Sequence, residues 1–214
     1  MIKRRDFLLT SLSFAFAGMV MPSVLFAKNP AAANLTDAQK QDVKRITEYL
    51  NGISSFAGRF QQYSDQGGLA TGSIYMRRPG FLRVEYDPPV KILLVADGIA
   101  MNYLDLELNH LEQAPLQLSP MWFLLRKKID LDDDVVVTGL EKSANAIRLH
   151  LVQSGAPEAG SVSLEFLDKP LELHQWIITD PNKNEVRVGI FDARFGIPLD
   201  NALFKTPSKR SKKG

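Results

Sequence analysis

The chain contains no cysteine among its 214 residues. This absence excludes a disulfide framework, a thiolate nucleophile, a cysteine-ligated zinc site and a lipid-modified cysteine. Histidine is scarce as well. His110, His150 and His174 lie far apart and lack the spacing of metal ligands. Cysteine- and histidine-based chemistry is therefore not expected.

Sequence motifs of enzymes are also missing. No GxSxG, HExxH, SxxK, GxGxxG or P-loop pattern occurs in a suitable context. The stretch DPNKNE at 180–185 resembles the start of a calcium loop, but Glu185 stands where that loop requires glycine, and a hairpin turn explains the stretch better. The acidic stretch 130–134 is interpreted as a solvated loop. We predict no catalytic residue, no metal site and no cofactor.

Positive charge is sparse in the body of the chain and concentrated at its two ends. The formal charge of +2 includes seven bases and one acid from the first six and the last six residues. Without these, 19 bases and 23 acids remain, a net charge of about −4. A nucleic-acid-binding surface favours a basic body. We therefore expect no nucleic-acid partner.

The first 33 residues have the pattern of an export signal. A basic start containing RRDFL, which resembles a twin-arginine signal, precedes a long apolar run, and small residues permit cleavage after Ala27 or Ala33. The alternative is a retained membrane anchor over residues 7–27, although Gly18 and Pro22 interrupt that run. We predict a removed signal peptide (1–33), a single domain (34–207) and a disordered basic tail (208–214).

The sequence of the domain predicts one helix followed by many strands. Thr36 and Gln39 form a capping-box pattern before an apolar stripe at helical spacing, which ends near Ile53. From Phe56 onward period-2 patterns dominate, with strands expected at 73–78, 81–87, 135–141, 146–153, 161–168, 171–179 and 185–193. Residues 64–72 and 106–118 read as loops. The sequence predicts a mostly β (α+β) fold, a strongly curved antiparallel sheet or incomplete barrel with helices plugging it.

Two further segments have specific patterns. Asp97-Gly98 predicts a two-residue hairpin turn that pairs Ala96 with Ile99 and Leu94 with Met101, with this face toward the interior. Ser119-Pro120 predicts the start of a short helix that is apolar nearly all round, carries Met121, Trp122, Phe123 and Leu124, and ends in cations.

The stretch 74–90, IYMRRPGFLRVEYDPPV, contains an unexpected charge. Because side chains alternate along a strand, Arg78 falls on the same face as Ile74 and Met76, whereas Arg77 falls on the opposite face. A guanidinium directed at an apolar interior needs oxygen acceptors there. Arg78 is therefore the leading candidate for a functional residue.

Several stretches in order resemble the periplasmic outer-membrane lipoprotein carrier proteins of the Lol pathway. These are FAGRFQQ, GSIYMRRPGFLRVEY, KILLVADG and LFKTP, within a match that runs from about residue 40 to 207. The resemblance implies an incomplete barrel with a hydrophobic cavity closed by helices. It also implies a non-enzymatic periplasmic carrier of triacylated lipoproteins, which receives them from an inner-membrane ATP-driven release complex and delivers them to an outer-membrane acceptor. A monomer is expected.

In this family an arginine before a proline latches the lid by bonding to its backbone, and only Arg78 occupies that place. The cavity wall is predicted to contain the apolar side chains of the first strands: Phe56, Phe60, Leu82, Val84, Ile92, Leu94, Met101 and Tyr103. Met121, Trp122, Phe123 and Leu124 are the predicted lid. The chain departs from better-known members in its twin-arginine-like signal, its short C-terminus and residues 104–118. A related periplasmic module that binds or senses another lipid is the alternative, and a hydrolase with an unrecognised site is a third reading.

Overall fold

The computed structural model describes residues 31–65 and 67–207. The predicted signal peptide, apart from its last residues, and the basic tail lie outside these ranges, so their boundaries stay predictions. Within the described part of the chain, no helix is both long and apolar enough to cross a membrane.

In the part of the chain that the structure describes, one α-helix precedes the strands, as the sequence indicates. Helix α2 (Asp37–Gly52) begins with the predicted capping box, because Gln39 N donates to Thr36 Oγ1 and Thr36 N donates to Gln39 Oε1. Its buried stripe contains Val43, Ile46 and Leu50. The helix therefore needs an apolar sheet face to cover.

That face belongs to a single antiparallel sheet of eleven strands. In chain order they are β1 (Ser55–Ser64), β2 (Gly68–Arg77), β3 (Phe81–Tyr86), β4 (Ile92–Asp97), β5 (Ala100–Asp105), β6 (His110–Pro115), β7 (Val135–Lys142), β8 (Ala146–Gln153), β9 (Ser161–Asp168), β10 (Leu171–Thr179) and β11 (Glu185–Phe195). The spatial order is β6-β5-β4-β3-β2-β1-β11-β10-β9-β8-β7, so β6 and β7 are open edges and the barrel is incomplete.

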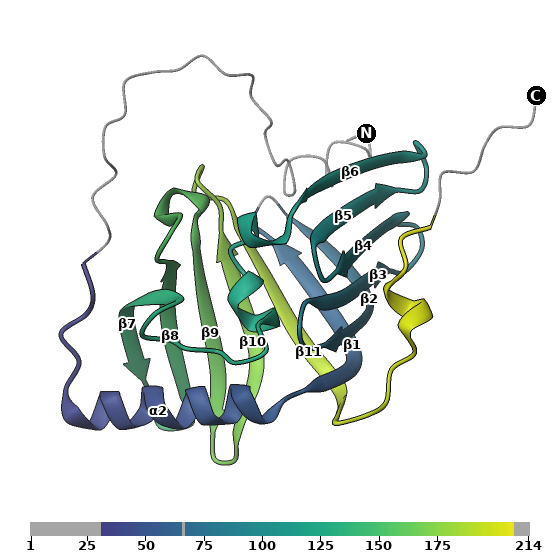
Figure 1. The fold of residues 1–214 in the computed structure, drawn as a ribbon. Helices are drawn as coiled ribbons and strands as arrows, with labels where there is room; N and C mark the ends of the chain where they lie inside the picture. Colours follow the sequence, from purple (N-terminus) through teal and green to yellow (C-terminus); the bar gives the residue numbers. More distant parts are fainter. Residues whose placement is uncertain (1–30, 66, 208–214) are drawn as a thin grey trace, which may run out of the picture.

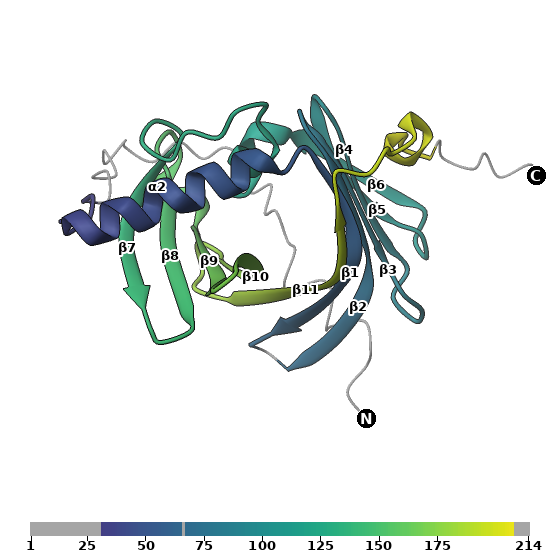
Figure 2. The ribbon, with the colours of Figure 1, turned by 90° about the horizontal axis from the view of Figure 1, so that it is seen from below.

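The sheet is strongly curved (Figures 1 and 2). Strands β1–β6 form one wall, β7–β10 form the other, and β11 joins them (Figure 2). Helix α2 crosses the ends of β7–β10, and the segment that follows β6 lies between the two walls (Figure 1). The predicted fold class is thus confirmed.

The apolar side chains fall into two large clusters. The first joins α2 to β7–β9 and contains Ile46, Leu149, Leu164 and Phe166, each with 0% of its surface exposed. The second lines the inner face of β1–β5 and β11. Gly72 in β2 is required by this packing, because a Cβ there would lie 2.4 Å from the Phe60 ring.

The predicted hairpin register is wrong by two residues. Ala96 pairs with Met101, and Leu94 pairs with Tyr103. The turn falls on Gly98 and Ile99, because the Asp97 carboxylate accepts hydrogen bonds from the N–H groups of Ile99 (3.0 Å) and Ala100 (2.9 Å). A shift of two preserves which side chains share a face.

The prediction that only one face of this hairpin is interior is incomplete. Leu93, Val95 and Leu104 form a third, small buried cluster on the opposite face. On that convex side a C-terminal 3₁₀ turn, η4 (Asn201–Phe204), packs against β3 and β4. Sequence alternation cannot reveal a cover that comes from a hundred residues further along the chain.

Two other expectations are corrected. Residues 106–118 are not a loop: they contain β6 and the 3₁₀ turn η1 (Leu116–Leu118). Strand β6 pairs only with β5 and is largely exposed, so it carries no apolar alternation. Likewise the link at 64–72 is shorter than expected, because β2 already begins at Gly68.

The predicted helix after Ser119-Pro120 is only one 3₁₀ turn, η2 (Trp122–Leu125). Its N-cap is Met121, and the Trp122 N–H donates to Ser119 O at 3.0 Å. A run this short gains little from helical hydrogen bonds, so packing decides its conformation. We call residues 116–129 the lid segment.

Candidate functional site: an arginine between the helix and the lid segment

Arg78 follows directly after β2, where the chain turns toward β3. Its backbone N–H donates to Ser54 O at 2.8 Å, which holds it beside the end of α2. From there Nε donates to Leu124 O at 2.7 Å and Nη1 donates to Leu50 O at 2.5 Å. Leu50 lies in the last turn of α2 and Leu124 lies in η2. A single side chain therefore bridges the helix and the lid segment, through carbonyls at helix ends.

The charge of Arg78 has only dipoles for partners. Among the ion pairs of the described residues, none joins Arg78 to a carboxylate. Burial lowers the pKa of Arg78 to about 10, so the guanidinium still carries its charge at neutral pH. A partly buried cation held by carbonyls alone is less favourable than one that is paired with an anion. The bridge therefore consists of two hydrogen bonds to main-chain carbonyls, without an ion pair.

The neighbouring arginine lies on the other face, as the alternation predicts. The guanidinium of Arg77 lies over the rings of Phe81 (4.5 Å) and Phe204 (5.0 Å). Its Nη1 donates to Leu199 O and to Asn201 Oδ1. Arg77 therefore holds the C-terminal segment against the convex face.

The turn after Arg78 makes a second bond to the lid segment, which the sequence analysis missed. The Gly80 N–H donates to Leu125 O at 2.7 Å, and Gly80 O accepts from the Gly98 N–H at 3.1 Å. Gly80 has φ +83°, and a Cβ on it would lie 2.8 Å from Gly98 Cα. The glycine after Arg-Pro was the available signal for this close approach.

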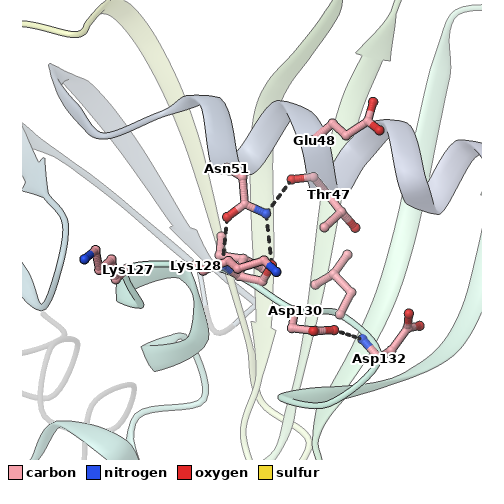
Figure 3. Close-up of a pocket in the computed structure, with 9 residues that line it drawn as sticks. Thr47, Glu48, Asn51, Lys127, Lys128, Asp130 and Asp132 are labelled. Atoms are coloured by element: carbon pink, nitrogen blue, oxygen red, sulfur yellow. Dashed lines mark hydrogen bonds between the residues drawn. The ribbon is translucent and has the colours of Figure 1, made fainter.

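Asn51 makes a third connection between α2 and the lid segment, which the sequence did not predict (Figure 3). Its Nδ2 donates to Ile129 O at 2.9 Å, and its Oδ1 accepts from the Ile129 N–H at 2.8 Å. Both backbone groups of a fully buried residue are thereby satisfied. An open pocket of about 540 Å³ lies beside this contact, lined by α2 and residues 127–132. It contains none of the predicted wall residues.

All eight predicted wall residues meet in the second apolar cluster. Phe56, Phe60 and Ile92 are buried members, and Leu82, Val84, Leu94, Met101 and Tyr103 pack against them while partly exposed. The cluster also contains residues that were not predicted: Ile74, Met76, Val186, Val188 and Ile190. Their period-2 alternation in β2 and β11 was a usable signal.

The four predicted lid residues are divided between the clusters. Phe123 is a buried member of the first cluster, and Met121 and Leu124 pack against that cluster. Trp122 packs against the second cluster, which also contains Leu125. The lid segment thus joins the packed half of the molecule to the inner face of the other half. The predicted roles of Arg78, the wall and the lid as a latch and an acyl-chain site stay predictions.

The stretches considered for metal binding have structural explanations. Asp180 and Asn184 belong to a hairpin turn, in which the Asn184 N–H donates to Asp180 Oδ1 at 2.9 Å and Asn184 Nδ2 donates to Asp180 Oδ2 at 2.8 Å. Asp134 pairs with Arg126 and accepts from the Asp130 N–H. In residues 31–65 and 67–207 no three acidic or histidine side chains gather as metal ligands would.

Comparisons with known proteins agree with this architecture. Residues 51–207 match the profile of the family "Outer membrane lipoprotein carrier protein LolA". Since that match covers more than half of the chain, the protein belongs to this family. The resemblance inferred from the sequence is confirmed.

Individual relatives are distant. An outer-membrane lipoprotein carrier protein of Azotobacter vinelandii is 30% identical over 88 residues, which is 39% of this chain and 40% of the relative. The chain therefore matches less than half the length of that relative. A crystal structure of a DUF1329 family protein from Desulfovibrio piger covers 78% of this chain and 96% of its own at 9% identity, with a TM-score of 0.50. A LolA superfamily protein from Nitrosomonas europaea covers 76% and 97% at 10% identity, with a TM-score of 0.45.

Proposed function

We propose that this protein is a non-enzymatic periplasmic carrier of lipoproteins. In this proposal the signal peptide is removed, and the monomeric domain receives triacylated lipoproteins from an ATP-driven release complex of the inner membrane. It carries their acyl chains against the inner face of β1–β5 and β11 and delivers them to an outer-membrane acceptor. Family membership supports the lipoprotein ligand, and the apolar second cluster supports a site for acyl chains.

A carrier of this kind is needed on energetic grounds. A triacylated anchor has several dozen methylene groups, and each favours burial by ~0.8 kcal/mol. The anchor therefore cannot leave a membrane for water on a useful timescale without an apolar cover. An empty carrier has the same difficulty on a smaller scale, because its own apolar site also needs a cover. The lid segment supplies that cover in the proposal.

The bridge from Arg78 to Leu50 O and Leu124 O is the observation that carries the proposal. Acyl chains that enter the second cluster displace the lid segment, and displacement breaks these bonds. The loaded state loses two charge-assisted hydrogen bonds, each contributing roughly 1.5–3 kcal/mol. That loss makes the loaded carrier less stable relative to the empty one, so transfer to an acceptor is favourable.

Comparing Arg78→Leu with Arg77→Leu tests the latch. We expect purified Arg78→Leu to bind a synthetic triacylated lipopeptide at least as well as the parent protein and to release it to excess serum albumin about tenfold more slowly. Arg77→Leu, which changes the adjacent arginine on the convex face, should load and release like the parent. Loss of loading in Arg78→Leu with normal release would contradict the latch.

The alternative, a module that binds or senses another lipid, predicts a different native ligand. The same fold occurs in the Desulfovibrio piger protein of another family, and a fold does not determine a function. Native mass spectrometry of the protein purified from its own periplasm separates the two. Bound triacylated lipoprotein supports the carrier, whereas free phospholipid supports the alternative.

A further inference from the structure

Trp122 is the one residue of the lid segment with a buried side-chain polar atom that lacks a hydrogen-bond partner. Its indole Nε1 is inaccessible to solvent and has no hydrogen-bond acceptor. The side chain packs against the second apolar cluster, where acyl chains bind in the proposed function. A buried N–H without an acceptor is unfavourable by about 1–3 kcal/mol. An unpaired buried donor therefore needs an explanation, and a ligand that supplies the acceptor is one.

Another buried polar group of the cluster has a partner. Tyr86, a buried member, donates its hydroxyl to Gln62 Oε1 at 2.7 Å. Trp176, the other tryptophan of the chain, also packs against the cluster, but its indole nitrogen is not among the buried polar atoms that lack a partner. Of the two tryptophans, only Trp122 thus has an indole nitrogen that is both buried and without an acceptor.

The orientation of the Trp122 ring is fixed by its surroundings. The guanidinium of Arg126 lies over the ring at 5.2 Å, and Arg126 also pairs with the buried carboxylate of Asp134. On the backbone, the Trp122 N–H donates to Ser119 O at 3.0 Å. Ser119 and Arg126 belong to the lid segment themselves, so both contacts move with Trp122 when acyl chains displace that segment, and they continue to orient the donor.

We propose that Trp122 Nε1 donates a hydrogen bond to an acyl carbonyl of the bound lipid and so selects ester- or amide-linked chains over ether-linked chains. This inference rests on the proposed function and specifies the chemistry of its ligand. The acyl tails carry no acceptor themselves, so their carbonyls are the first acceptors along each chain. An ether oxygen is a weaker acceptor than a carbonyl. A site that hydrogen-bonds a ligand group discriminates against analogues without that group.

The test uses two matched pairs of ligands. One pair is a triacylated lipopeptide and its analogue in which all three acyl links are replaced by alkyl links. The other is diacylphosphatidylglycerol and its dialkyl-ether analogue. With the parent protein we expect the carbonyl-bearing member of a pair to bind about threefold to tenfold more tightly. The pair that shows this preference identifies lipoprotein or phospholipid as the source of the carbonyl.

The variant Trp122→Phe keeps an aromatic ring but removes the donor, and it should bind both members of each pair equally. Trp176→Phe is the matched control and should keep the preference. Because the preference is a ratio within one variant, a general loss of stability does not imitate it. If the parent protein binds both members equally, or if Trp122→Phe keeps the preference, the inference is wrong and the proposed function stands. If no lipid of either pair binds the parent protein, the proposed function fails.

Discussion

The two walls of this single sheet use apolar side chains in different ways. In the half formed by β7–β9, helix α2 covers the sheet, and Ile46, Leu149, Leu164 and Phe166 have no exposed surface. In the half formed by β1–β5, most buried residues keep a few per cent of exposed surface, and five of the predicted wall residues are only partly buried. The first half is a conventional core. The second half keeps an apolar face that a ligand could use.

The difference arises from how the helix is attached. At its N-terminal half α2 is tied to the ends of β7 and β9 by ion pairs of Asp42 and Arg45 with Lys142 and Asp168. At its C-terminal end the ties to the lid segment come from Arg78 and Asn51. The helix is therefore attached to β7 and β9 by ion pairs and to the lid segment by hydrogen bonds.

The largest expected effect is on stability, and a matched pair of leucines measures it. Leu164→Ala, in the first half, should lower the free energy of unfolding by roughly 2–5 kcal/mol, because the side chain is fully buried. Leu94→Ala, in the second half, should lower it by less than half as much. Urea denaturation of both variants is the measurement. Equal losses would mean that the second half is packed as tightly as the first.

A substitution of Asn51 tests the contact between α2 and the lid segment separately from Arg78. Asn51→Leu leaves the buried backbone groups of Ile129 without partners, so the free energy of unfolding should fall by about 1–3 kcal/mol. Hydrogen exchange should show loss of protection at the Ile129 amide. Glu48→Gln, an exposed change one turn earlier that lines the same pocket, should stay within about 0.5 kcal/mol of the parent. Unchanged exchange at Ile129 in Asn51→Leu would contradict this account.

The smallest expected effect is on the stability of the fold at acidic pH. The hydrogen bond from Arg45 holds the pKa of Asp168 below its ordinary value of 3.8, and Lys142 adds to that shift. A carboxyl whose pKa is lowered in the folded state stabilises the protein at pH values above its ordinary pKa. The contribution is lost as the pH falls through the lowered pKa. Asp168→Asn should therefore show a smaller loss of stability between pH 7 and pH 3 than the parent.

Asp87 is the control for this prediction in the second half. The hydrogen bond from Arg59 lowers its pKa too, and Thr71 contributes, but its side chain is 36% exposed compared with 5% for Asp168. Solvent screening weakens such a pair. The pH dependence of urea midpoints should change less in Asp87→Asn than in Asp168→Asn. The opposite order would show that burial does not govern these pairs.

The sequence predicted the elements whose pattern is local. The capping box of Thr36 and Gln39, the apolar stripe of α2 and the alternation of most strands depend on neighbours within one or two turns. The placement of Arg78 on the apolar face also followed from alternation alone. Several errors fall where a distant contact decides: η2 is a short turn packed between two clusters, and β6 is an exposed edge strand with no burial pattern. The hairpin register is an exception, because there the nearby Asp97 side chain sets the turn.

By itself, then, the sequence determined the fold class, the family and the side of β2 on which each arginine lies, because these depend on periodicity and on ordered motifs. Only the tertiary structure decided which carbonyls Arg78 bonds and that Gly80 and Asn51 also bond the lid segment. It also decided that the buried Nε1 of Trp122 has no acceptor. Such partners come from segments 28 to 78 residues away, as the pairs Arg78–Leu50 and Asn51–Ile129 show, and no local pattern records them.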